Sequence, residues 1–275
     1  MHGDDAFEHE TKGARVGLNP MFGEWSHTFA FAPVPYGAGG ERRAAFRKAV
    51  QAELTNQFLY THDVQLEITL YLDLRTILET DQTADLDNYA KALLDALKGP
   101  DGIFLDDTEV QALTISWIDN NGPRDTRFEV RARSSPDDFM LKPIEFYELS
   151  DGLFYPHGRR AWSLDGRATG PRDQYAMLCV LDQMVRYARA FRHELRKGGA
   201  SPLSAFRFSQ YVSPIARGYH RSRIEGFPTH RRRSWLASFE DWTRSNPNDG
   251  ALIRESVNRL RAVHDEFVRA HGRAE

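Results

Sequence analysis

The sequence predicts an α+β domain with a mixed sheet and flanking helices, followed by a mostly α-helical C-terminal domain. Residues 64–72 alternate apolar and polar side chains, which is typical of a strand with one buried face. From residue 86 to 98 the apolar period becomes helical. Beyond residue 170 only helical patterns follow, so the two halves differ in class.

The first half is predicted to run strand, helix, strand, helix, strand, strand. Pro33 and Pro35 end the first strand, and Gly99-Pro100 ends the second helix. The last strand is expected to be the hairpin partner of the one before it, because Asn120-Asn121-Gly122-Pro123 forms a turn. The expected strands are 24–31, 64–72, 108–118 and 127–133, and the expected helices are 41–55 and 86–98. Residues 74–84 are a connection.

The second half is predicted to be a set of helices punctuated by glycine and proline. A loop-rich stretch to about residue 170 precedes helices at 172–197, 202–219, 230–245 and 251–270. Ser134-Ser135-Pro136-Asp137-Asp138 is the expected boundary. We therefore predict a flexible tail at 1–22, an α+β domain at 23–135 and a helical domain of unknown role at 136–275.

The composition is that of a globular protein. Of 275 residues 27% are charged and 41% hydrophobic, and no apolar run approaches the ~18 residues of a membrane span. The acidic start lacks the apolar run of a secretory signal. Cys179 is the one cysteine, which excludes an internal disulfide and a cysteine-cluster metal site. We expect a cytoplasmic protein with no membrane partner, and Cys179 as a buried thiol.

The formal charge is divided unequally along the chain. Residues 1–135 sum to −9 and residues 136–275 sum to +6, which together give the net charge of −3. This difference predicts two units with different roles. An acidic half repels a polyanion, whereas DNA affinity normally depends on phosphate neutralisation.

Four aspartates and a lysine form the pattern that carries chemistry. Asp85 lies at the expected N-cap of the second helix, with Asp87 in its first turn and Lys91 one turn later. Asp106 and Asp107 begin the next strand, and we expect the connection to return them to the N-terminus of that helix. Carboxylates crowded in this way need a hard cation such as Mg²⁺ or Mn²⁺. These are the components of a site that hydrolyses phosphodiesters.

Each residue also has an ordinary structural interpretation. Asp85 alone is a helix cap, Asp87 and Lys91 are a surface i,i+4 pair, and Asp106-Asp107 is a turn. On spacing alone, both interpretations stay open.

The pattern resembles the RusA family of Holliday-junction resolvases. It reads Asp85-Leu86-Asp87-Asn88-Tyr89-Ala90-Lys91, continues to Asp95-Ala96-Leu97, and ends in Leu105-Asp106-Asp107. The strand and helix order around it agrees, over about residues 24–133. The resemblance implies a homodimer that cuts branched DNA with Mg²⁺ or Mn²⁺. It implies metal ligation by Asp85, Asp87 and Asp107, with Asp106 as the alternative to Asp107, and catalysis by these acids with Lys91.

Two departures from the family pattern give an alternative function. Residues 78–84 lack the arginines that usually precede the first motif aspartate, and about 140 C-terminal residues match no family. The alternative is a non-catalytic RusA-fold subunit of a larger nucleic-acid-processing or defence complex. A nuclease for flaps or RNA is a third hypothesis.

Basic residues concentrate between 192 and 233, interleaved with aromatics. Arginines with aromatics suit phosphate contact and base stacking, and a helical bundle with a solvated basic face is the ordinary alternative. We predict nucleic-acid contact by Arg231, Arg232 and Arg233, because like charge at a helix start needs compensation. The helical half is also expected to supply DNA affinity or to bind a protein partner.

Overall fold

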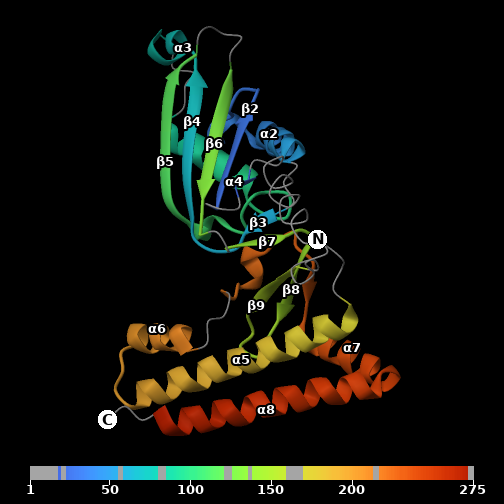
Figure 1. Ribbon diagram of the computed structural model, residues 1–275. Coiled ribbons are helices and arrows are strands. Elements are labelled where there is room, and N and C mark those ends of the chain that lie inside the picture. Colours follow the sequence, from blue (N-terminus) through green and yellow to red (C-terminus); the bar gives the residue numbers. More distant parts are fainter. Residues whose placement is uncertain are drawn as a thin grey trace, which may run out of the picture. The chain divides into compact units, whose positions relative to one another are not determined.

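The structure is a computed structural model that divides into two compact units (Figure 1). Unit 1 comprises residues 1–142 and 223–226, and unit 2 comprises 143–222 and 227–275. The structure describes residues 18–19, 23–54, 58–79, 85–120, 126–135, 138–158, 170–212 and 217–271. Most of the expected tail, most of the expected turn at 120–123, and parts of the expected boundary and loop-rich stretch therefore lie outside the described residues.

Unit 1 is built on a five-stranded mixed sheet with the strand order β1-β2-β6-β4-β5. Its strands are β1 (Leu18–Asn19), β2 (Glu24–Phe29), β4 (Val64–Leu72), β5 (Val110–Asp119) and β6 (Arg127–Arg133). Strand β4 is parallel to β5 and antiparallel to β6. A separate two-stranded sheet pairs β3 (Phe58–Tyr60) with β7 (Phe139–Leu141). This confirms the predicted mixed sheet.

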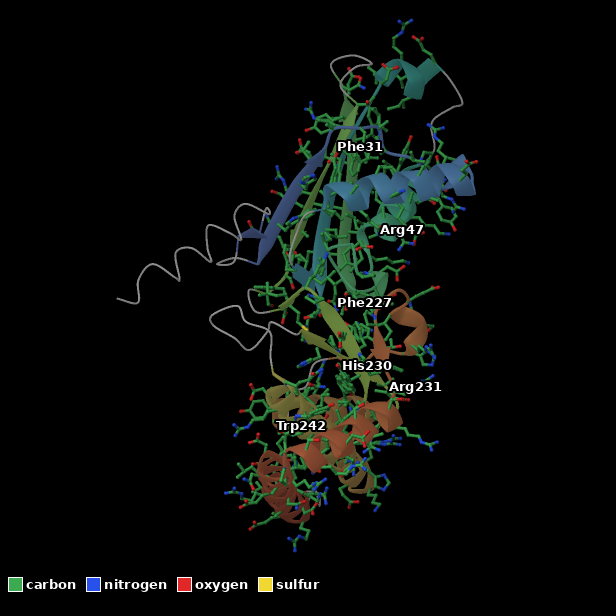
Figure 2. All side chains as sticks on the ribbon, turned by 90° about the vertical axis from the view of Figure 1, so that its right-hand side faces the viewer. Phe31, Arg47, Phe227, His230, Arg231 and Trp242 are labelled. Carbon is green, nitrogen blue, oxygen red and sulfur yellow. The ribbon has the colours of Figure 1, made fainter. Side chains whose placement is uncertain are left out.

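Helices α2 (Gly40–Glu53) and α4 (Leu86–Leu97) cover one face of this sheet (Figure 1). The alternation in β4 places Leu66, Ile68 and Leu70 in the core, where each buried side chain stabilises the fold by about 1.5–3 kcal/mol. Leu93 of α4 packs into the same core. Phe31, labelled in Figure 2, packs at its border. The predicted connection at 74–84 contains the short helix α3 (Leu74–Glu79).

The predicted hairpin of the last two strands of unit 1 is wrong. Strand β6 pairs with β2 and β4 instead, and β5 pairs with β4. Phe128, Val130 and Ala132 are fully buried, which agrees with the central position of β6 between β2 and β4. The parallel pairing of β4 with β5 follows from the helical crossover through α4.

Unit 2 is mostly helical, as predicted. Its helices are α5 (Pro171–Lys197), α6 (Pro202–Val212), α7 (Arg232–Ser245) and α8 (Pro247–His271). Helices α5 and α8 pack side by side, and the ring of Tyr187 stacks on His264 with centroids 3.9 Å apart (Figure 1). Among the described residues, no helix is long and apolar enough to cross a membrane.

A small sheet that the sequence did not predict completes unit 2. It joins β10 (Thr229–His230), β8 (Ile144–Glu148) and β9 (Phe154–Gly158) in that order. The predicted helix at 230–245 therefore begins only at Arg232, because His230 belongs to β10. The predicted helix at 202–219 is described to Val212, and Tyr219 forms a β-bridge with Phe154.

Candidate functional site

Helix α4 presents three of the predicted site residues at its exposed N-terminal half. Its apolar stripe is buried, which turns Asp87 and Lys91 outward. Asp85 is the N-cap residue, and its backbone carbonyl accepts hydrogen bonds from the backbone N–H groups of Asn88 and Tyr89. Its carboxylate makes no capping bond. Asp85 and Asp87 thus keep solvent-facing carboxylates with no ion pair in the described part of the chain.

Lys91 lies over the ring of Tyr36, a contact that sequence reasoning missed. Its Nζ is 3.8 Å from the ring centroid, and the guanidinium of Arg43 in α2 is 4.0 Å from the same centroid. The hydrogen bond with Arg43 and the charge of Lys91 lower the pKa of Tyr36. Tyr36 belongs to the 3₁₀ turn η1 (Tyr36–Ala38), and no spacing rule links it to α4. The result is a basic cluster of two cations and a tyrosine.

Asp106 has a structural role at the turn η2 (Asp107–Glu109). Its Oδ1 accepts hydrogen bonds from the backbone N–H and the hydroxyl of Thr108 at 3.1 and 2.7 Å. The buried carboxylate of Glu109 accepts in return from the backbone N–H groups of Leu105 and Asp106. This capping box leaves Asp107 as the more exposed acid of the pair.

Asp107 lies between two cations. Its carboxylate is 3.4 Å from Nζ of Lys98 and 3.8 Å from Arg223, which also contacts Asp106 at 3.3 Å. Burial opposes the charge of Lys98, but the carboxylates of Asp95 and Asp107 outweigh burial and raise its pKa. Arg223 lies in the short segment 223–226, which belongs to unit 1. It is more than 110 residues from Asp106 along the chain.

The connection after α4 folds against the C-terminal end of that helix. Backbone N–H groups of Ile103 and Gly99 donate to the carbonyls of Leu97 and Phe104. A side chain at Gly102 is excluded, because its Cβ would lie 2.0 Å from the carbonyl oxygen of Leu97. Lys142 donates to the carbonyl of Gly102 at 3.0 Å, and burial lowers its pKa to about 8.

The aspartates predicted to share a site therefore lie at opposite ends of α4. Asp85 and Asp87 are at its start, whereas Asp107 contacts Lys98 just after its end, and twelve helical residues span about 18 Å. The expected return of the connection to the helix N-terminus does not occur. In the described residues of one chain, no three acidic, histidine or cysteine side chains form a group that could hold a metal.

The comparison with protein families identifies this unit. Residues 40–131, about a third of the chain, match the family described as Endodeoxyribonuclease RusA. This part of the chain is similar to that family. The matched residues include α2, β4, α4 and β5, with all four predicted catalytic residues. A comparison with curated proteins gives no match for the chain.

The predicted nucleic-acid contacts of unit 2 have partners within that unit. Arg231 lies where β10 passes into α7 (Figure 2), with its guanidinium 3.2 Å from Glu148. Glu148 also accepts from the backbone N–H of Arg232, whose guanidinium pairs with Asp182 at 3.0 Å. These carboxylates provide the compensation expected at this helix start. Arg233 is exposed, and the predicted nucleic-acid role of all three arginines stays a prediction.

Proposed function

We propose that the protein is an endodeoxyribonuclease of the RusA type that hydrolyses phosphodiester bonds in branched DNA. The match to the family over residues 40–131 carries this proposal. The exposed face of α4 supports it, because Asp85, Asp87 and Lys91 are available to a substrate there. The Mg²⁺ or Mn²⁺ requirement implied by the resemblance is part of the proposal.

The side chains of this face have separate roles in the proposed reaction. The ammonium of Lys91, steadied over the ring of Tyr36, stabilises negative charge on the phosphate oxygens as water attacks phosphorus. Arg43 supplies a second positive charge beside the same ring. The carboxylates of Asp85 and Asp87 orient the attacking group. The oxygen of the attacking water bonds to phosphorus and its proton passes to solvent, while the bond from phosphorus to the leaving sugar oxygen breaks and that oxygen takes a proton from solvent. The strand is thus nicked with no covalent enzyme intermediate.

A second copy of the chain is proposed to complete the site, through pairing of β5. In the described residues β5 is an edge strand of ten residues, and it has no charged side chain from Val110 to Ile118. Leu113 and Trp117 are more than a third exposed. Long uncharged edges of this kind are templates for pairing with another strand.

The sequence of β5 is complementary to itself in an antiparallel register. With a two-fold axis at Ile115, Leu113 of each copy faces Trp117 of the other, and Thr114 faces Ser116. Leu113, Ile115 and Trp117 continue the buried rows of β4, so pairing would join two cores. This supports the homodimer implied by the resemblance.

Antiparallel pairing also bears on the separated acids. Strand β5 begins beside Asp107, and α4 runs opposite to β5 because it connects the end of β4 to the start of β5. In the dimer, Asp107 of one copy and the α4 N-terminus of the other lie toward the same end of the joined sheet. We propose that these acids act together across the two copies.

The proposed activity is tested with fluorescently labelled four-way junction, flap, duplex and single-stranded DNA. Wild-type protein should nick a branched substrate with Mn²⁺ and not with EDTA. Asp87→Asn should be inactive, and Glu67→Gln, which changes an exposed acid of β4, should cut like wild type. Equal cutting by Asp87→Asn would assign the activity to a contaminant or another site.

Mixed variants test whether the acids act across copies. Asp87→Asn and Asp107→Asn should each be inactive, but after mixing and subunit exchange one intact site per heterodimer should restore cutting. Activity that stays absent in a heterodimer verified by mass would place both acids in one chain. Trp117→Lys should shift the sedimentation coefficient toward that of a monomer.

The alternative of a non-catalytic nucleic-acid-binding or assembly subunit has one observation in its favour. Lys98 and Arg223 both contact the carboxylate of Asp107. These ion pairs within the chain engage a carboxylate that a catalytic role would need for the metal. Binding of branched DNA without cutting under any of these metal conditions would support this alternative over the nuclease.

A further inference from the structure

Unit 2 contains a basic groove between α5 and α6, which is lined by part of the predicted basic stretch 192–233 but by none of Arg231, Arg232 and Arg233. The groove has a volume of about 960 Å³, and its lining includes Ala205 of α6. Helix α6 packs along the C-terminal half of α5 (Figure 1). Six lining residues are basic or histidine, namely Arg186, Arg189, Arg192, His193, Arg196 and Lys197. None of the described lining residues is acidic.

The basic side chains come mostly from one face of α5. Positions 186, 189, 193 and 196 repeat at helical spacing, while Tyr187, Phe191 and Leu195 form the adjoining buried face. Packing of the apolar face against α8 and α6 therefore fixes the direction of the arginines. A rigid helix holds them in a row without the entropy cost of ordering a loop.

Acidic neighbours neutralise only two of these cations. Arg186 pairs with Asp182 at 3.1 Å and Lys197 pairs with Glu194 at 2.9 Å. Arg189, Arg192 and Arg196 make no ion pair in the described part of the chain. The row from Arg189 to Arg196 rises about 10.5 Å along the helix.

One exposed aromatic side chain, Phe206, lines the same groove. Phe206 is 48% exposed, with the guanidinium of Arg192 5.9 Å from its ring centroid. Tyr211, further along α6, is 88% exposed. Large aromatic faces open to water beside free guanidinium groups are the elements that bind unpaired bases and their phosphates.

We propose that this groove binds a DNA strand with unpaired bases, with phosphates on Arg189, Arg192 and Arg196 and a base stacked on Phe206. This inference rests on the proposed function for the choice of DNA as the polyanion. It gives unit 2 the affinity that the acidic first half of the chain lacks, since counterion release at several phosphates drives such binding. It replaces Arg231 and Arg232 as the main contacts, because their charges are already paired.

The test measures binding of the full-length protein to labelled DNA by fluorescence anisotropy in EDTA, where no cutting occurs. Arg189→Ala/Arg196→Ala should weaken binding to a single strand on the order of tenfold at 0.1 M salt. The slope of log K against log salt should fall by about 1.4, which is 0.7 for each lost contact. Both arginines are exposed and unpaired, so the melting temperature should not change.

A matched variant removes the same charge elsewhere in unit 2. Arg244→Ala/Arg259→Ala breaks two exposed intrahelical pairs in α7 and α8, and it should bind like wild type. Phe206→Ala should weaken single-strand binding more than duplex binding. Wild-type affinity and salt slope in the groove variant, or tighter binding of duplex than of single strand, would overturn the inference. Nuclease activity in a separate assay would stand regardless of that result.

Discussion

Replacing Arg232 by alanine separates a structural role from a role in DNA contact. Its guanidinium makes a two-pronged pair with Asp182, with Nε 3.3 Å from Oδ1 and Nη2 3.0 Å from Oδ2. The side chain of Asp182 is 10% exposed and that of Arg232 is 31% exposed. Burial alone would raise the pKa of Asp182, but the bonds and charge of Arg232 outweigh it and lower that pKa.

Removing one partner of a buried pair costs about 3–5 kcal/mol when a charge is left uncompensated. Asp182 keeps Arg186 and the backbone N–H of Ser150, which is 2.7 Å away, and Arg232 is partly solvated. We therefore expect Arg232→Ala to lower the free energy of unfolding by about 2 kcal/mol, which is below that range. For a unit of this size, the melting temperature should fall by roughly 5–10 °C.

Circular dichroism and tryptophan fluorescence during urea unfolding measure this change. Trp235 reports on the same region, because its indole N–H donates to the backbone carbonyl of Glu148. Arg231→Ala is the matched control. Arg231 is 53% exposed and contacts Glu148 through one nitrogen, so its loss should cost less than about 1 kcal/mol. Unchanged stability of Arg232→Ala with a salt-dependent loss of DNA binding would refute the reasoning.

The same pair predicts acid sensitivity. The pKa of Asp182 is lower in the folded protein than its ordinary value of about 3.9. The ionised carboxylate therefore stabilises the fold fully at a pH above about 3.9, and this stabilisation is lost as the pH falls through the lowered pKa of the folded protein. The difference in stability between wild type and Asp182→Asn should thus be constant at neutral pH and shrink below about pH 4.

Two further predictions concern unit 1. Asp106→Ala removes an N-cap and should lower the free energy of unfolding by about 1–2 kcal/mol in chemical denaturation. The control Asp107→Ala should change the free energy of unfolding by less than about 0.5 kcal/mol. Equal effects of the two substitutions would contradict the capping role of Asp106. Lys142→Met should raise the free energy of unfolding at pH 7 by about 1 kcal/mol, because burial lowers the pKa of Lys142 to about 8. The wild-type protein becomes more stable between about pH 8 and 10.4, because Lys142 is neutral in the folded protein there. The stability advantage of Lys142→Met in unfolding titrations should therefore disappear at high pH. An advantage that is independent of pH would exclude burial of the Lys142 charge as its cause.

Local patterns were enough to predict much of the fold. The alternation at 64–72 and the helical stripe at 86–98 each record one buried face, and both elements lie where the sequence placed them. Strands β8 and β9 were missed because almost all their residues are buried, so they show no alternation. The neighbours of β6 depend on long-range packing that a turn signal does not encode.

The candidate site was less predictable than the fold. The exposure of Asp87 and Lys91 follows from helical periodicity. Asp106 and Glu109 form a capping box. The sequence contains both residues, but the structure is needed to identify the groups that they bond. The approach of Arg223 to Asp107 joins residues far apart in the chain, and no local rule predicts such a contact.

The return of residues 223–226 to unit 1 has a consequence for synthesis of the protein. Ile224 in this segment is almost fully buried, and Arg223 pairs with Asp106. On the ribosome, residues 1–142 emerge long before this segment, so the first unit waits for most of the second before its last contacts form. A shortened gene ending at residue 142 would therefore yield a nascent domain that lacks a native anchor.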